Sequence, residues 1–198
     1  EGSFVVMYSG NHSPCHPLSS VVDAAIRLKD EDEVRFLFVG GGTGWAEIRR
    51  IKERENLTNV ICLPYQPLER VGASLGAADL HIVAMGDPFV GLVHPCKVYN
   101  LLTLGMPFVV VGPGESHLGD LLKELGEGSG CVGVRHGDGA ALARIIQERA
   151  AKPVSEPSRL KKVGEQFRQS VLAPKLANIR SEEHTSELQS RQYLVCRL

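Results

Sequence analysis

The sequence lacks several features that would assign a protein to a class at once. No run of apolar residues approaches the roughly 20 residues needed to span a bilayer, and no signal-peptide pattern is visible. The net charge is −1, with acidic and basic residues interspersed, so there is no basic patch of the kind that nucleic-acid binding needs. The five cysteines include no C-x-x-C pair, and the histidines show no ligand spacing, so we expect no metal held by the protein.

An initiator methionine is also missing. The chain begins Glu1-Gly2-Ser3 and enters an apolar run almost at once, so we expect it to be an excised piece of a longer protein. The 198 residues, 43% of them hydrophobic, suffice for one domain, or two at most, with a sizeable core.

The last residues share no pattern with the rest of the chain. Residues 180–190, RSEEHTSELQS, resemble codon for codon the translation of a sequencing-library adapter, and residues 191–198 continue it. Such a segment is set aside in fold reasoning, like a cloning scar. We therefore expect residues 180–198 to be a non-native tail and residues 1–179 to be one domain. The alternative is a genuine amphipathic tail.

Elsewhere, short apolar runs alternate with longer stretches of helical spacing. This alternation predicts an α/β fold, a Rossmann-like parallel sheet with helices on both faces, and the continuously apolar strands fit a sheet buried on both sides. In such sheets ligands bind beyond the carboxyl ends of the strands, where the strand order switches. The expected strands are residues 4–9, 34–40, 59–64, 79–85, 107–112 and 131–137, and the expected helices are residues 18–30, 45–57, 68–78, 95–105, 117–128, 139–150 and 158–170.

The segments after the first two strands contain residues that suit a phosphate. Gly10 lets the backbone approach a ligand closely, and Asn11 and His16 can reach a phosphate, although these residue types also make plain turns. The loop that contains Gly41 and Gly42 has four glycines within five residues, which suggests a phosphate cradle at a helix amino end. A dinucleotide fingerprint would place an acidic residue at the end of the next strand, and none stands there.

The segments after the third and fourth strands are also informative. Tyr65 and Gln66 lie in a loop whose backbone can meet the edge of a nucleobase; the alternative is a loop that only leads into a helix. Lys97 lies in the first turn of the helix that Pro95 and Gly105 bracket. A cation there opposes the helix dipole by roughly 0.3–1 kcal/mol. A bound diphosphate would explain it, and the alternative is a lysine extended into solvent.

The histidines are weaker candidates for the site. We expect His94, His117 and His136 to be surface or turn residues, and His81, inside an apolar strand, to be a core residue with its hydrogen bonds satisfied.

Five segments together resemble the C-terminal domain of family 4 glycosyltransferases of the GT-B fold, most closely the bacterial polysaccharide branch. The resemblance covers roughly residues 3–175. The segments are YSGNHSPCHP (8–17), FLFVGGGTGWAEI (36–48), NVICLPYQPLERV (59–71), AADLHIVAM (77–85) and HPCKVYNLLTLGMPFVVVG (94–112).

The resemblance implies a binding site for a nucleotide diphosphate sugar. By that analogy Lys97 pairs with the diphosphate, near Asn11 and the Gly10 backbone. The loop of Tyr65 and Gln66 meets the base, and the loop of Gly41 and Gly42 lines the nucleotide side of the cleft. Asn100 stands where many relatives have a ribose-binding glutamate, and Val98 and His16 complete the expected binding set.

The resemblance also implies an activity and its partners. We expect the donor-binding half of a cytoplasmic sugar transferase, which uses a saccharide or lipid-linked acceptor in bacterial polysaccharide biosynthesis. The N-terminal acceptor domain would be missing and the piece alone inactive, and the intact enzyme can lie against the inner face of the membrane. No cofactor is expected to be tightly bound, although Mg²⁺ can accompany the diphosphate. The alternatives are a nucleotide-sugar epimerase of GT-B type and a dinucleotide-binding domain.

The sequence departs from the family pattern at five places. Asn11 and His16 stand where relatives commonly carry an arginine and a lysine. Leu92 and Asn100 stand where many relatives carry two glutamates seven residues apart, so ribose is held more weakly or by other groups. Cys96 replaces the usual serine, which removes a good helix-capping hydroxyl.

Overall fold

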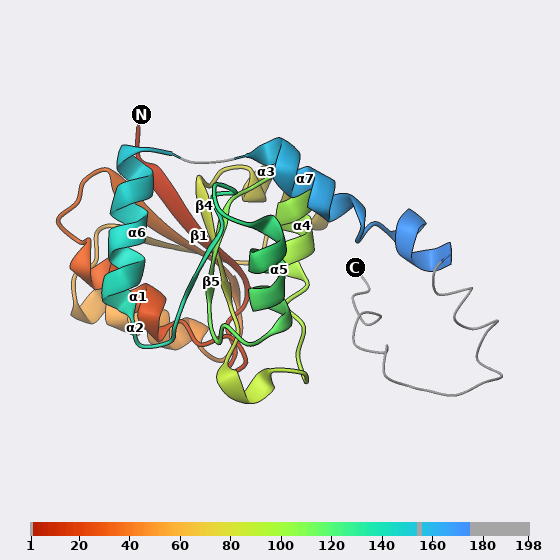
Figure 1. Cartoon of the computed structure of the whole chain (residues 1–198). Coiled ribbons are helices and arrows are strands. Elements are labelled where there is room, and N and C mark those ends of the chain that lie inside the picture. The colour runs from red at the N-terminus through yellow and green to blue at the C-terminus, as the bar shows by residue number, and fades with distance from the viewer. Residues whose placement is uncertain (1, 154–155, 175–198) are drawn as a thin grey trace.

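The computed structural model describes residues 2–153 and 156–174, so the expected tail at residues 180–198 lies outside the described residues (Figure 1). The strands are β1 (Phe4–Asn11), β2 (Val34–Gly41), β3 (Val60–Leu63), β4 (Leu80–Ala84), β5 (Phe108–Val111) and β6 (Val132–Val134). The helices are α1 (Ser19–Arg27), α2 (Trp45–Arg54), η1 (Leu68–Arg70), α3 (Val71–Leu75), η2 (Asp87–Phe89), α4 (Lys97–Leu104), α5 (His117–Leu125), α6 (Gly139–Ala151) and α7 (Pro157–Glu165).

The expected fold class is confirmed. In the described part of the chain, six parallel strands form one sheet in the order β3-β2-β1-β4-β5-β6, which is the Rossmann order. The order reverses between β1 and β4. These two neighbours are paired only at Val6–Leu80 and Met7–His81, whereas β1 follows β2 over its whole length. The two central strands therefore separate toward their carboxyl ends, and this is the expected ligand position for the fold.

Helices cover both faces of the sheet because its central strands are apolar on both sides. One core contains Tyr8 and Phe36 and is covered by α1, α2 and α6. The other contains Met7 and Val83 and is covered by α3, α4, α5 and α7. Figure 1 shows the first group to the left of the sheet and the second to its right, with the loop that contains η2 below the carboxyl ends of the strands.

One predicted helix end agrees with the structure, and one predicted helix is longer than the observed one. Helix α4 ends at Gly105, which adopts a left-handed conformation with φ 75°, as predicted. The helix predicted over 68–78 was too long. A 3₁₀ turn precedes a five-residue α3 there, and α3 stops at Gly76; the glycines at 72 and 76 lower the helix propensity of this segment.

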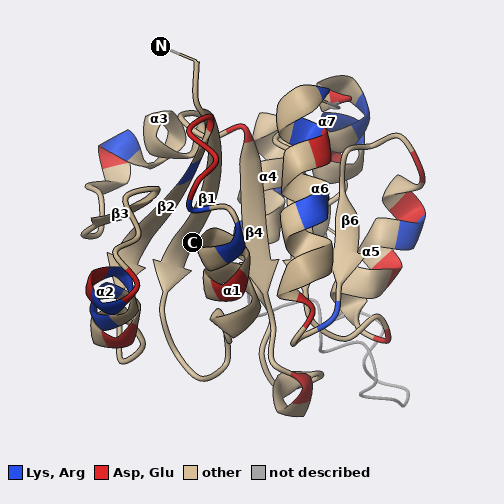
Figure 2. Cartoon of the chain, turned by 90° about the vertical axis from the view of Figure 1, so that its left-hand side faces the viewer, with Lys and Arg blue, Asp and Glu red and all other residues tan. Residues whose placement is uncertain are grey.

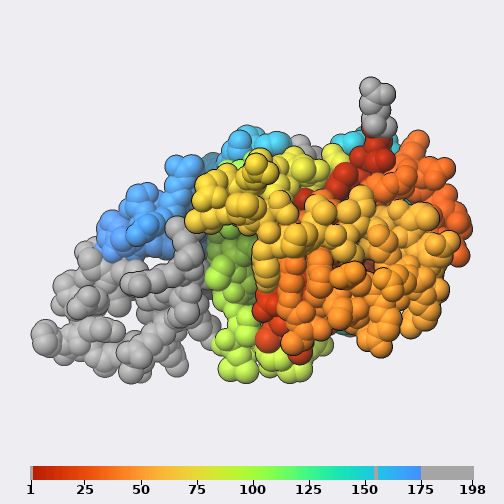
Figure 3. Space-filling view, turned by 180° about the vertical axis from the view of Figure 1, so that it is seen from behind, coloured from red at the N-terminus to blue at the C-terminus, as the bar shows by residue number. Residues whose placement is uncertain are grey.

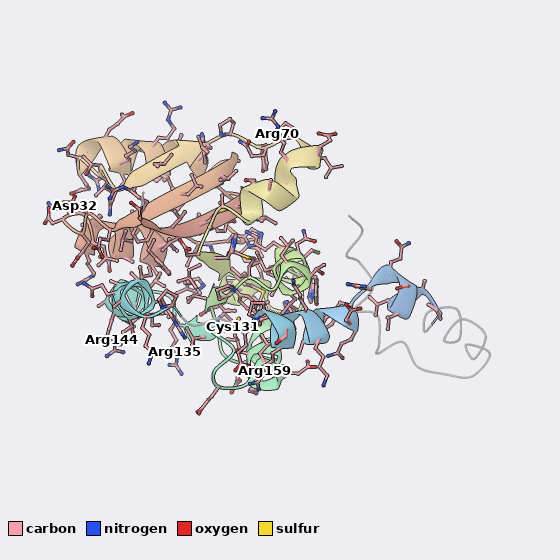
Figure 4. The ribbon with its side chains drawn as sticks, turned by 90° about the horizontal axis from the view of Figure 1, so that it is seen from above. Asp32, Arg70, Cys131, Arg135, Arg144 and Arg159 are labelled. Carbon is pink, nitrogen blue, oxygen red and sulfur yellow. The ribbon has the colours of Figure 1, made fainter. Side chains whose placement is uncertain are left out.

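The surface charges are dispersed, as expected from the sequence. Figure 2 shows Lys and Arg interspersed with Asp and Glu over the elements in view, and Figure 4 shows Arg70, Arg144 and Arg159 on η1, α6 and α7, well apart. Among the described residues there is no helix long and apolar enough to cross a membrane, and no group of three or more potential metal ligands.

His81 is a core residue with its hydrogen bond satisfied, as expected: it is 2% exposed and its Nε2 bonds to the Leu75 carbonyl at 3.0 Å. Burial lowers the pKa of His81 to about 4. In the unfolded chain, His81 is protonated below its ordinary pKa of about 6.5. In the folded protein it is protonated only below about pH 4, so between these two pH values the unfolded state binds more protons than the folded state.

We therefore expect the domain to lose stability as the pH falls from about 6.5 to about 4. His81 alone accounts for roughly 2–3 kcal/mol of that loss. Chemical denaturation at a series of pH values measures it. His81→Gln should be less stable at neutral pH but show a flatter pH dependence, and an unchanged slope in this variant would contradict the assignment.

Candidate functional site

The structure brings the loops after β1 and β2 into direct contact. Asn11 is opposite Gly41 in the parallel register. A Cβ added to Gly42 would lie 2.2 Å from Asn11 Oδ1, so a side chain at position 42 would collide with the amide. Gly42 has φ +118°, a conformation that L side chains rarely adopt. These three predicted site residues therefore form one small backbone surface at the carboxyl edge of the sheet.

The loop after β3 reaches the same surface. A Cβ on Gly41 would lie 3.1 Å from the Tyr65 ring, and Tyr65 is 60% exposed. Gln66 donates from Nε2 to the carbonyl of Pro64 at 3.0 Å, so its amide stabilises its own loop. Tyr65 thus presents an aromatic face beside the glycines, which is suitable for a planar group such as a base.

Lys97 is turned inward rather than extended into solvent. The side chain as a whole is partly exposed, but its Nζ atom is inaccessible to water and has no hydrogen-bond partner among the described residues. Nζ lies 3.7 Å from the centroid of the Tyr8 ring, and a Cβ on Gly10 would lie 3.0 Å from it. Burial lowers the pKa of Lys97 to about 7. The alternative of a lysine extended into solvent therefore does not hold in the ligand-free domain, and the pairing of Lys97 with a diphosphate stays a prediction.

No countercharge compensates Lys97. No ion pair involves it in the part of the chain that the structure describes, and burial is the sole cause of its lowered pKa. The titratable groups that face it are Tyr8 on β1, His12 and His16 after β1, and His81 on β4. Burial, with a smaller contribution from the Lys97 charge, lowers the pKa of all three histidines. The Lys97 amino group is therefore enclosed among groups that offer it no negative charge.

Two histidines connect neighbouring loops. His16 bonds through Nδ1 to the carbonyl of Ala84 at 2.8 Å, which ties the loop after β1 to the end of β4. His136 lies in a turn, as expected; it is partly buried and bonds through Nε2 to the Met85 carbonyl at 2.8 Å. His16 thus lies at the site, where it has a structural role in the ligand-free domain.

The two other α4 residues in the predicted set lie in different surroundings. The Val98 side chain is fully buried in the core, so only its backbone could meet a ligand, and its N–H already bonds to the Pro95 carbonyl at 3.2 Å. Asn100 is exposed on the same helix. A ligand contact of either residue stays a prediction.

Sequence reasoning missed Tyr8 and His12. Tyr8 is 1% exposed, its ring lies against Lys97, and its hydroxyl donates to the Asn11 carbonyl at 2.7 Å. His12 is equally buried between Tyr8 and Trp45, with ring centroids 4.9 and 4.8 Å away. Tyr8 is indistinguishable in sequence from any aromatic residue in an apolar strand, and His12 lies in a stretch with turn composition, so no local pattern marks either one.

His94 and His117 were expected to be surface or turn residues and are instead partly buried. Their rings stack with centroids 3.8 Å apart, and His94 Nε2 bonds to the Tyr99 hydroxyl. Burial, and then the neighbouring His94, lower the pKa of His117 to about 4. This pair joins the loop before α4 to the start of α5.

A hollow of about 460 Å³ lies beside the site rather than at Lys97. Trp45, Arg49 and Lys52 line it from α2, and Cys62 and Pro64 from β3 and the loop after it. Figure 3 views the molecule from behind: residues 45–65 lie in orange, and the loop before α4, in yellow-green, projects at the lower edge beside the end of β1. The hollow is therefore on the flank, next to the loop of Tyr65.

Comparison with known proteins gives the class of the domain. No protein-family model matches the chain. The catalytic domain of cholesterol-α-glucosyltransferase from Helicobacter pylori is similar in structure, with a TM-score of 0.67 at 13% identity over 83% of this chain and 99% of that one. The pneumococcal O-GlcNAc transferase GtfA, in complex with UDP and GlcNAc, has a TM-score of 0.64 at 14% identity over 93% of this chain and 37% of that one. The fold is therefore that of one lobe of a GT-B glycosyltransferase.

A relationship in sequence makes the class more specific. The chain is 31% identical over 119 residues to WcaI of Escherichia coli K12, a protein assigned to colanic acid biosynthesis as a glycosyl transferase. The match covers 60% of this chain and 29% of the relative, so the chain spans less than a third of that protein's length. The resemblance to the C-terminal domain of family 4 glycosyltransferases is confirmed.

Proposed function

We propose that this domain binds the nucleotide diphosphate sugar donor of a glycosyltransferase. The observation that carries the proposal is Lys97, whose Nζ is enclosed at the start of α4 beside Gly10, with no hydrogen-bond partner or ion-pair partner in the described residues. A buried ammonium is costly unless something pairs with it. A diphosphate at the amino end of α4 would meet this cation and the positive end of the helix dipole.

The surroundings of Lys97 support a nucleotide rather than a free phosphate. The Gly41 and Gly42 backbone lies between the Lys97 end and the exposed ring of Tyr65. The diphosphate would lie at Lys97 and Gly10, and the base near Tyr65 and Gln66. The similar transferase GtfA was determined with UDP, so uridine diphosphate is the first donor fragment to test.

The reaction follows from this placement. In transfer of the sugar to an acceptor hydroxyl, negative charge develops on the departing diphosphate, and Lys97 with the positive end of the α4 dipole would stabilise it. The similarity to WcaI supports a role in bacterial polysaccharide biosynthesis, with a saccharide or lipid-linked acceptor bound by a separate N-terminal domain. Any Mg²⁺ would arrive with the diphosphate. This domain alone would not catalyse sugar transfer, because the acceptor would be bound by the other domain.

Calorimetric titration of the domain with uridine diphosphate, uridine and NAD tests the proposal. We expect the diphosphate to bind, uridine to bind more weakly because it lacks the group that pairs with Lys97, and NAD not to bind measurably. Binding of NAD but not of the diphosphate would instead favour a dinucleotide-binding domain. For an epimerase, the carboxylates Asp87 and Glu115, both exposed, are the cleft candidates, so interconversion of epimeric nucleotide sugars by the chain would support that alternative.

A further inference from the structure

The contact between Tyr8 and Lys97 joins the two faces of the sheet. Tyr8 belongs to the core beneath α1, α2 and α6, whereas Lys97 begins α4 on the opposite face. They meet beyond the short β1–β4 pairing, where the two strands have separated. The Lys97 side chain therefore crosses the sheet at the switch in strand order and contacts a ring that belongs to the opposite face.

The ammonium at this position is not ready to bind a ligand. Nζ is inaccessible to water, with Gly10 on one side and the Tyr8 ring at 3.7 Å on another, so a phosphate oxygen cannot reach it without movement. The ring offers a cation an attractive face but no hydrogen-bond acceptor. The ammonium therefore keeps its donors unused in the ligand-free domain.

We propose that the Tyr8 ring holds Lys97 in a closed position in the ligand-free domain, and that a nucleoside diphosphate binds when Lys97 leaves this ring. Tyr8 is then a positioning residue that competes with the ligand for the ammonium. The displacement of Lys97 by a nucleoside diphosphate rests on the proposed function. The closed position in the ligand-free protein does not depend on it.

The closed position has a consequence for protons. With burial lowering the pKa of Lys97 to about 7, much of the lysine is neutral in the free domain slightly above neutral pH, and pairing with a diphosphate would restore its charge. Binding then takes up about one proton near pH 8, where free uridine diphosphate is already ionised. His12, His16 and His81 are the other groups that could accept it, and all three have lowered pKa values.

Nuclear magnetic resonance of the domain with ¹³C-labelled lysine tests the closed position directly. In the free protein, the ε-methylene signal of Lys97 should lie upfield of the other lysines because of the Tyr8 ring current, and saturating uridine diphosphate should remove this shift. Tyr8→Phe should keep the shift and Tyr8→Leu should lose it. Absence of the shift in the free domain, or its persistence in the saturated complex, would overturn the inference. A shift in the free domain with no binding of the diphosphate would overturn only the proposed function.

Affinity and proton uptake give a second test. Tyr8→Leu and Tyr8→Phe both lose the bond to the Asn11 carbonyl, and only Tyr8→Leu loses the ring. Below pH 7, where Lys97 is still charged in the free domain, we expect Tyr8→Leu to bind uridine diphosphate roughly twofold to thirtyfold more tightly than Tyr8→Phe. Phe36→Leu, which removes a buried ring of the same core, should leave the affinity unchanged. Weaker binding by Tyr8→Leu than by Tyr8→Phe would contradict the competition.

Calorimetric titration near pH 8, repeated in buffers of different ionisation enthalpy, measures how many protons the domain takes up when uridine diphosphate binds. The wild-type domain should take up about one proton per diphosphate, and Lys97→Gln should take up none. If the uptake survives in Lys97→Gln and disappears in His16→Gln, an imidazole is the acceptor and the inference is wrong. These counts do not depend on whether the Tyr8 variants fold.

Discussion

Lys97→Gln should weaken the binding of uridine diphosphate roughly tenfold to a hundredfold or more. The change removes a charge-assisted hydrogen bond worth about 1.5–3 kcal/mol, and each 1.4 kcal/mol is about tenfold in affinity. Without ligand, the same change should be neutral or slightly stabilising, by up to about 1 kcal/mol, because a cation at the start of α4 opposes the helix dipole. The ammonium is also buried without a countercharge in the described residues, which adds to its cost. Calorimetric titration and chemical denaturation measure the two effects.

Two controls separate this effect from a general loss of positive charge. Lys29→Gln removes an exposed lysine that follows α1 and should leave the affinity within about twofold, since surface charges beyond a Debye length are screened. Uridine should lose much less affinity than the diphosphate in Lys97→Gln, because its base contacts lie near Tyr65. Equal affinity of wild type and Lys97→Gln for the diphosphate would mean that Lys97 takes no part in binding.

Gly40→Ala should destabilise the domain by about 3–5 kcal/mol, a large share of the 5–15 kcal/mol that holds a typical domain folded. Gly40 has φ +132°, and a Cβ there would lie 2.0 Å from the Gly10 carbonyl oxygen. Both the backbone conformation and the close approach of β1 and β2 therefore exclude a side chain. Because Gly10 adjoins Lys97, a variant that still folds should also bind uridine diphosphate less well.

A second glycine provides the matched control. Gly72, exposed in α3, has nothing within 4 Å of an added Cβ, so Gly72→Ala should stabilise the domain by about 0.5–1 kcal/mol through helix propensity. Denaturation midpoints of the two variants make the comparison. A Gly40→Ala variant as stable as wild type would contradict the close approach of Gly40 to the Gly10 carbonyl oxygen.

Most of the fold could be predicted from the sequence because its signals are local. Continuous apolar runs gave the strands, helical spacing gave the helices, and Gly105 marked the end of α4 because only glycine adopts that conformation at little cost. The alternation of the two patterns then limited the topology to a parallel sheet. The change from η1 to α3 between Arg70 and Val71 was missed because a three-residue 3₁₀ turn and a five-residue helix together have the apolar spacing of one longer helix.

The candidate site could be predicted in part for the same reason. Loops that follow parallel strands meet at one edge, so Gly10, Asn11, Gly41 and Tyr65 could be grouped before the structure was known. The direction of Lys97 could not be predicted, since it depends on the separation of β1 and β4 and on a ring from the opposite core. Tyr8 and His12 were missed because their roles arise from contacts across the sheet rather than from any spacing along the chain.

The central claim is that a nucleoside diphosphate binds at the carboxyl edge of the sheet, on Lys97 and the glycine loops. Backbone amide chemical shifts of the ¹⁵N-labelled domain, recorded during titration with uridine diphosphate, test it most directly. The account predicts saturable shifts at Gly10, Gly41 and Tyr65 and in the first turn of α4, with α7 and the amino ends of the strands unaffected. Saturable shifts confined to another surface, or none at millimolar diphosphate, would contradict it.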